Sequence, residues 1–413
     1  MQVPSTFRWL TAAVLIATTL FVVTTQYVLP QMFTGQVASP IAPYALPLAP
    51  VPTNPAPAAP PTFNGSNKLQ LAFLLDTSGS MDGLLDQAKA RLWSILNQAL
   101  EMERDGQTPT IEVALYQYGN DNLAVRTGYI QQVLPFTSDV DELSEKLFAL
   151  TTSGGDEYCP QAIQRAANEL AWDADDAVVK LLYIAGNEEF EQGPVTLPTA
   201  VRAALAKSIS INTIFCGGGG NATNSGWAQA ANTGNGDFFN INQNEAVAYI
   251  ESPYDDQIAA LNAQLNTTYV PINEEAEIAQ VKQRREDANA ATYSSANLAA
   301  RVKYKASKSY KNAKWDLVDA ATDDEEVLTT IQASLPDSLS SLSAEMLKEK
   351  VTKLSEKRRA LQTEIEQLSS SREAYVAEQK AATATVQTET LGDKIKGSVR
   401  ERLHSKGYQV KTN

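Results

Sequence analysis

The chain has 413 residues, a formal net charge of −14, one histidine and two cysteines. A single His404 cannot supply a Ser-His-Asp triad or a His-rich zinc site, and two cysteines are too few for thiolate zinc or iron–sulfur centres. The acidic composition also disfavours nucleic acid as the main partner. An oxygen-ligand metal site, carboxylate chemistry and protein binding remain.

Charge divides the chain into three zones. Residues 9–67 carry no charged side chain, residues 69–252 carry 24 acidic and 9 basic residues, and residues 253–413 carry 24 acidic and 23 basic residues. These differences predict an apolar N-terminal part, an acidic central domain and a charge-balanced C-terminal part.

The N-terminal zone predicts a membrane anchor. Residues 9–29 are uncharged and mostly apolar, and 21 residues at about 1.5 Å each match a hydrocarbon core of about 30 Å. Arg8 favours residues 1–8 in the cytoplasm and a single-pass membrane protein whose bulk is extracytoplasmic, in the periplasm or at the cell surface. A cleaved signal peptide is the alternative, because the most apolar stretch, 9–23, is short.

A Pro/Ala-rich linker is predicted over residues 30–67. Nine prolines fall within residues 40–61, a composition that favours extended polyproline II over helix or sheet. We expect a tether that holds the following domain away from the N-terminal segment.

Residues 68–252 alternate between strand-like and helix-like patterns, which predicts an α/β fold with a doubly wound, mostly parallel sheet. No helix separates 111–118 from 129–134, so these two form a hairpin with one antiparallel edge strand. Strands are predicted at 69–75, 111–118, 129–134, 178–185, 209–216 and 238–241, and helices at 82–103, 139–150, 161–172, 197–207, 226–231 and 245–251.

A hard-cation site is predicted where the first strand ends. Asp76, Ser78 and Ser80 stand in the sequence Asp-Thr-Ser-Gly-Ser-Met between a buried strand and a helix. One carboxylate and two hydroxyls are the oxygen ligands that Mg²⁺, and equally Mn²⁺ or Ca²⁺, prefer. The alternative is a helix cap, in which the hydroxyls satisfy the first backbone amides.

At these residues the sequence resembles the von Willebrand factor A (VWA) domain and its metal-ion-dependent adhesion site. The resemblance covers about 180 residues and implies a mostly parallel sheet with helices on both faces. It implies a second-loop ligand at Glu157, six residues before Ile163, with Asp156 and Thr152 as possible ligands in its place.

The third loop departs from the pattern of that family. The family's usual carboxylate position falls on Gly186. This leaves Asn187 or Glu188 to contact the ion or a bound water, and metal occupancy is open on this ground.

The resemblance implies protein binding rather than catalysis. In the family a partner's Asp or Glu fills an open coordination position of the ion, and we expect the same adhesion-like role here. Adjacent carboxylates such as Asp156 and Glu157 rarely face each other across a substrate, so an enzyme is not expected. The alternatives are a scaffolding protein of the cell envelope that acts through a coiled coil, and a partner of an AAA-type ATPase chaperone.

Cys159 and Cys216 are both expected near the carboxyl edge of the sheet. A disulfide between them is predicted, and it would stabilise by about 4 kcal/mol in the chain-entropy model. An extracytoplasmic location would permit it. Two buried free thiols are the alternative.

The C-terminal zone is predicted to be helical, with a helical extension at 253–340, a coiled coil at 341–382, and a flexible segment with a short basic helix at 383–413. Similar segments follow the A domain in bacterial membrane-anchored A-domain proteins, which this chain resembles over most of its length. Heptad spacing over residues 347–375 predicts a long helix that packs within the chain or self-associates, with two arginines on its seam.

Overall fold

The computed structural model describes residues 65–217, 226–241, 249–324, 326–382 and 391–411. These residues belong to one compact unit, Pro61–Asn413, while Met1–Pro60 form a separate unit. The predicted anchor at 9–29, almost all of the predicted linker, most of the predicted helix at 245–251 and the segment 383–390 lie outside the described residues.

The predicted membrane localisation requires correction. Among the residues that the structure describes, no helix combines the length and apolar character needed to cross a bilayer. The prediction of a single-pass membrane protein is not supported on this finding, and it is not retained.

A six-stranded sheet forms the centre of the fold, as predicted. Its strand order is β4-β3-β1-β5-β6-β7, and every neighbouring pair is parallel except β3 and β4, which form the predicted antiparallel edge. All eight residues of β5 are buried, as expected for a strand covered on both faces. The strands are β1 (Lys68–Asp76), β3 (Thr110–Tyr118), β4 (Ile130–Thr137), β5 (Val179–Gly186), β6 (Ser210–Cys216) and β7 (Phe238–Ile241).

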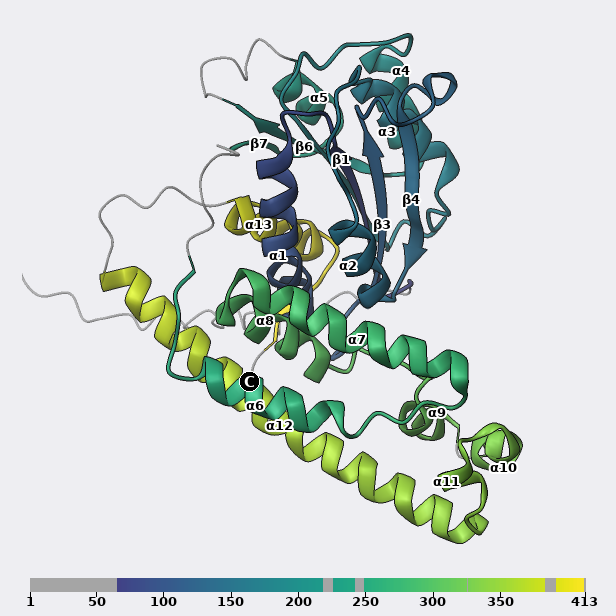
Figure 1. The fold of residues 1–413 in the computed structure, drawn as a ribbon. Helices are drawn as coiled ribbons and strands as arrows, with labels where there is room; N and C mark the ends of the chain where they lie inside the picture. The colour runs from purple at the N-terminus through teal and green to yellow at the C-terminus, as the bar shows by residue number, and fades with distance from the viewer. Residues whose placement is uncertain (1–64, 218–225, 242–248, 325, 383–390, 412–413) are drawn as a thin grey trace, which may run out of the picture. The chain divides into compact units, whose positions relative to one another are not determined.

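Helices cover both faces of the sheet (Figure 1). Alternate residues of β1 enter two separate cores: Leu71 packs in one, and Ala72 packs in the other. The second core contains α3 (Cys159–Glu169), α4 (Leu197–Leu205) and α5 (Trp227–Thr233), whereas the first contains α1 (Asp82–Leu100), α2 (Val140–Phe148) and α13 (Leu391–Ser405).

The basic C-terminal helix α13 is part of the core. Ile395, Val399 and Leu403 recur every four residues and are buried against the sheet and α1. After the helix, Tyr408 is fully buried, and β8 (Gln409–Val410) pairs with β2 (Met102–Glu103). The end of the chain therefore completes one face of the α/β domain.

The helices between β7 and α13 pack on the same face. Helix α8 contacts α1, and α7 contacts α2. The fully buried Arg301 links the two regions, because its guanidinium bonds Asp141 of α2 at 2.7 Å and Asp287 of α7 at 2.6 Å. The helices are α6 (Asp255–Asn266), α7 (Glu274–Tyr293), α8 (Ser295–Ala306), α9 (Leu317–Asp323), α10 (Val327–Ile331), α11 (Asp337–Ser340) and α12 (Ala344–Ala382).

The predicted heptad seam lies on α12, a single helix of 39 residues. Its apolar residues are buried, and α12 packs on α6, α8 and α9 of the same chain. Packing within the chain is therefore the alternative that the structure supports, and a self-associating coiled coil over 347–375 is not supported. The buried seam residues are Leu347, Val351, Arg358, Leu361 and Ile365.

The seam arginine Arg358 is held by an enclosed ion-pair network. Its guanidinium bonds Asp316 and Asp319, each at 2.6 Å, and donates to the Thr268 carbonyl. It also lies 4.0 Å from the ring centroid of Tyr269. An arginine that would weaken a two-stranded coiled coil is thus matched by partners within the chain.

We predict that Arg358→Ala lowers the free energy of unfolding by about 3–5 kcal/mol, because the buried Asp316 carboxylate loses its ion pair. On the same helix, Lys353→Ala removes an exposed pair with Glu349 and should cost less than about 0.5 kcal/mol. Urea unfolding followed by circular dichroism measures both. Equal midpoints for the two variants would show that the Arg358 network contributes nothing specific.

Candidate metal centre

The first loop of the site follows β1 at the carboxyl edge of the sheet. Asp76 ends β1 with a fully buried side chain, and the backbone N–H of Ser78 donates to Asp76 Oδ1 at 2.7 Å. The Ser78 Oγ lies 3.5 Å from Oγ of the exposed Ser80. One tight turn therefore places a carboxylate beside two hydroxyl groups.

The second loop brings Glu157 to the same turn. Glu157 is buried just before α3, and the Ser78 hydroxyl donates a hydrogen bond to its carboxylate. Gly119 follows β3 with φ +75°, and a Cβ there would lie 2.7 Å from Glu157 Cγ and 2.8 Å from Asp76 Oδ1. Glycine is required at this position, since both carboxylates pack against its backbone.

Gly186 ends β5 where the family usually has a carboxylate. A Cβ on Gly186 would lie 2.6 Å from the Tyr118 hydroxyl, 3.0 Å from Asp76 Oδ2 and 3.0 Å from the Trp227 ring. No side chain fits there without moving these groups. The departure from the family pattern thus follows from close packing under the third loop.

Asn187 presents its side chain to the site from this third loop. Its Nδ2 donates to Ser80 Oγ at 3.0 Å. The loop is fixed from behind, because Trp227 Nε1 donates to the backbone carbonyl of Glu188 at 2.8 Å. The structure therefore brings the predicted residues Asp76, Ser78, Ser80, Glu157 and Asn187 together from three loops.

Three oxygens of this cluster have no hydrogen-bond partner among the described residues. They are Asp76 Oδ2, Glu157 Oε2 and Asn187 Oδ1, one from each loop, and all are buried. A buried acceptor without a partner costs about 1–3 kcal/mol. Carboxylate, hydroxyl and amide oxygens are the donor set of a hard divalent cation, so the residues present fit such an ion.

Both carboxylates have raised pKa values. Burial raises the pKa of Asp76 to about 7, and the charge of Glu188 adds to the shift. Burial, and next the charge of Asp76, raise the pKa of Glu157 to about 8. Each group holds a proton readily near neutral pH unless another positive charge replaces it.

The remaining predicted residues lie around the cluster. The Thr152 hydroxyl donates to Asp82 Oδ1 at 2.6 Å, and the exposed Asp156 accepts from the Tyr158 hydroxyl at 3.2 Å. Glu188 is exposed, and its charge acts on both buried carboxylates. These three are not bonded to the cluster in the structure.

Sequence reasoning missed the residues that support the site. Tyr118 donates to the Ala185 carbonyl at 2.8 Å, which ties the end of β3 to the end of β5, two strands away. Gly119 provides space for the carboxylates. A glycine directly after a strand was the available signal for the second feature, whereas Tyr118 is typical of any buried strand.

The predicted disulfide is absent, since Cys159 and Cys216 are both free and buried. Cys159 packs in the core under α3 and donates to the Tyr118 hydroxyl, whereas Cys216 packs in the core on the opposite face of the sheet. The sheet between them prevents a bond. Proximity to the same edge was predicted correctly, but the face was not.

Among the described residues, no group of three or more His, Cys, Asp or Glu side chains is arranged to hold a metal ion. The candidate site has two buried carboxylates and otherwise hydroxyl and amide oxygens. The fold and this site define a doubly wound α/β domain with an oxygen-lined cluster at the carboxyl edge of its parallel strands.

Residues 70–253 match the family model of the von Willebrand factor type A domain. The resemblance expected from the residues around Asp76 is therefore confirmed for this stretch. The helices after residue 253 lie outside the match, and a membrane-anchored type is not shown. A comparison with curated proteins found no match.

Several solved structures are similar. Proximal thread matrix protein 1 from the mussel byssus, with a zinc-occupied MIDAS motif, is 12% identical with a TM-score of 0.34 and covers 44% of this chain, which spans 43% of that protein. The vWF domain of the pili tip protein Mfa5 from Porphyromonas gingivalis is 14% identical, with a TM-score of 0.32 and coverages of 43% and 90%. An aerotolerance-related membrane protein from Bacteroides fragilis is 17% identical, with a TM-score of 0.31 and coverages of 42% and 92%.

We predict that divalent-cation affinity rises with pH between 6 and 8.5. The pKa values of Asp76 and Glu157, about 7 and about 8, mean that a cation must displace protons at pH 6 but few at pH 8.5. The affinity for Mg²⁺ should therefore increase by about tenfold or more. Calorimetry in buffers of different ionisation enthalpy measures both affinity and proton release, and a constant affinity without proton release would contradict this account.

Proposed function

We propose that the chain is a divalent-cation-dependent protein-binding module, in the manner of an adhesion domain. Asp76, Ser78, Ser80, Glu157 and Asn187 are the proposed ligands, directly or through water. Mg²⁺ is the proposed ion, with Mn²⁺ or Ca²⁺ as substitutes. The proposal is supported by the match of residues 70–253 to a domain family with such sites.

The observation that carries the proposal is the set of three buried oxygens without partners on three separate loops. Loops far apart in sequence converge there, and the folded chain leaves one acceptor from each unsatisfied. A cation would satisfy all three and would offset the repulsion between Asp76 and Glu157.

The partner chemistry follows from charge. Residues 69–252 have 15 more acidic than basic residues, so an acidic partner is repelled by the domain as a whole. A bound cation with an open coordination position would reverse this locally and accept an Asp or Glu carboxylate of the partner. The exposed Ser80 and Glu188 border the cluster and would contact that partner.

Binding is proposed rather than catalysis or scaffolding. The exposed Asp156 bonds Tyr158, while Glu157 is buried, so these two carboxylates are not paired across a cleft. A scaffold acting through α12 is not favoured, because the seam of α12 is covered by helices of its own chain.

We predict that Asp76→Asn abolishes saturable Mg²⁺ binding by the full chain, because the substitution removes one charge from the proposed ligand set. The metal-free variant should be as stable as the wild type or more stable, since a buried carboxylate has been neutralised. Calorimetry and thermal unfolding with and without Mg²⁺ measure the two effects. Glu349→Gln, an exposed change on α12, is the control and should keep wild-type binding. Retained binding in Asp76→Asn would remove the site.

We predict that a carboxylate ligand displaces water from the bound ion. With Mn²⁺ in place of Mg²⁺, water-proton relaxation should be enhanced by the complex and should fall when a short peptide with one glutamate is added. The same peptide with glutamine is the matched control. An enhancement that ignores both peptides would show an ion without an open position for a carboxylate, and the adhesion proposal would then fail even if the ion binds.

A further inference from the structure

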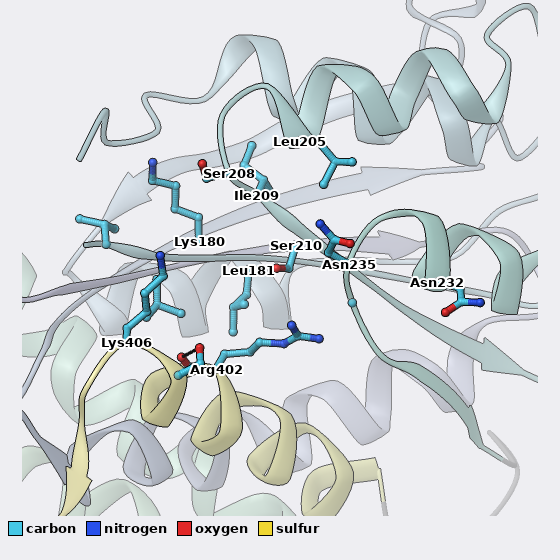
Figure 2. Close-up of a pocket in the computed structure, with 14 residues that line it drawn as sticks. Lys180, Leu181, Leu205, Ser208, Ile209, Ser210, Asn232, Asn235, Arg402 and Lys406 are labelled. Carbon is cyan, nitrogen blue, oxygen red and sulfur yellow. Dashed lines mark hydrogen bonds between the residues drawn. The ribbon is translucent and has the colours of Figure 1, made fainter. Parts of the chain in front are cut away.

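A second polar cavity of about 700 Å³ lies at the opposite edge of the sheet from the candidate metal centre. It is lined by the first residues of β5 and β6, where the metal loops follow the last residues of strands. The end of α13 closes it on one side (Figure 2). The cavity therefore joins the α/β domain to the C-terminal segment.

The charge of this cavity is opposite to that of the domain around it. Three basic side chains line it, Lys180 from β5 and Arg402 and Lys406 from the end of α13, and its 14 lining residues include no acid. The surrounding residues 69–252 carry only 9 basic residues in all. A local concentration of positive charge in so acidic a domain is the pattern of an anion site.

The two lysines make hydrogen bonds only to neutral groups among the described contacts. Lys180 Nζ donates to the Lys207 carbonyl at 3.2 Å, and Lys406 Nζ donates to the Asp176 carbonyl at 2.6 Å. An ammonium has three donors, so each uses one of them in a described bond. Arg402 pairs with Asp237 at 3.3 Å, with both side chains about one-third exposed.

The nearby acidic residues are engaged elsewhere. Asp173 pairs with Lys68 at 3.1 Å, and the Asp175 carboxylate accepts from the backbone of Ser66 and Ala177. They favour the charged form of Lys180 from one side, while burial and the charge of Lys406 lower its pKa. Two like charges thus face one cavity without a carboxylate between them.

Neutral hydrogen-bonding groups complete the lining. Ser210, Asn232 and Asn235 lie on the side of the cavity away from the lysines, with Arg402 reaching toward them (Figure 2). Asn235 has a left-handed backbone, φ +54°, which turns this loop at the rim. The cavity offers cations at one end and amide and hydroxyl groups at the other, which suits a small polar molecule with an anionic end.

We propose that this cavity binds a small organic anion that carries a phosphate group or several carboxylates. The anion would bridge Lys180 of β5 and the Arg402 and Lys406 side chains of α13, so its binding would hold the C-terminal helix on the sheet. This site needs no cation and is independent of the proposed adhesion function.

The test uses the full chain in EDTA, with pyrophosphate and citrate as probes in separate calorimetric titrations. Saturable binding of either supports the proposal, and the tighter probe tells phosphate from carboxylate recognition. Lys406→Gln should weaken binding about tenfold, because it removes a charge-assisted donor. Lys353→Gln on α12 is the matched control and should bind as the wild type does.

Two further results decide the outcome. Asp76→Asn should keep wild-type anion affinity, and a loss there would place the anion at the metal centre and overturn the proposal. Absence of saturable heat with both probes, or unchanged affinity in both Lys406→Gln and Arg402→Gln, would also overturn it. Circular dichroism of each variant confirms that α13 is folded, so a loss of binding reports the side chain.

Discussion

Two carboxylates buried side by side are the constraint on which the site depends. Asp76 and Glu157 pack against the backbone of Gly119, and neither forms an ion pair among the described residues. Such an arrangement raises the free energy of the folded chain, so it persists only because the sheet and both cores hold the loops in place. The stability of the rest of the domain is what keeps these oxygens unsatisfied and available.

Much of this site could be predicted because it follows from the ends of parallel strands. Asp76, Ser78 and Ser80 are local in sequence, and Glu157 could be placed by its distance from an apolar residue of the following helix. Asn187 was one of two choices after Gly186, and the structure shows that it, not the exposed Glu188, bonds the cluster. The fold followed from the same alternation of short apolar runs and helical patterns, which local sequence carries well.

The errors concern long-range packing. The disulfide between Cys159 and Cys216 failed because sequence gives distance along the sheet but not which face a residue occupies when one of the pair lies on a helix. Arg358 looked unfavourable on a helical seam because its partners, Asp316 and Asp319, lie on a different segment. The stripe of Ile395, Val399 and Leu403 was visible, but the surrounding basic residues suggested a solvated helix. In each case the deciding partner was remote in sequence.

The position of α13 and β8 has a consequence for how the chain is made. Ile395, Val399, Leu403 and Tyr408 belong to the same core as Leu69 and Leu71 of the first strand. During synthesis from the N-terminus, the α/β domain must wait with part of one face bare until its last twenty or so residues leave the ribosome. Premature termination anywhere before residue 391 would therefore release a chain with an exposed apolar face, and the quality of the C-terminus is checked by the domain at the other end.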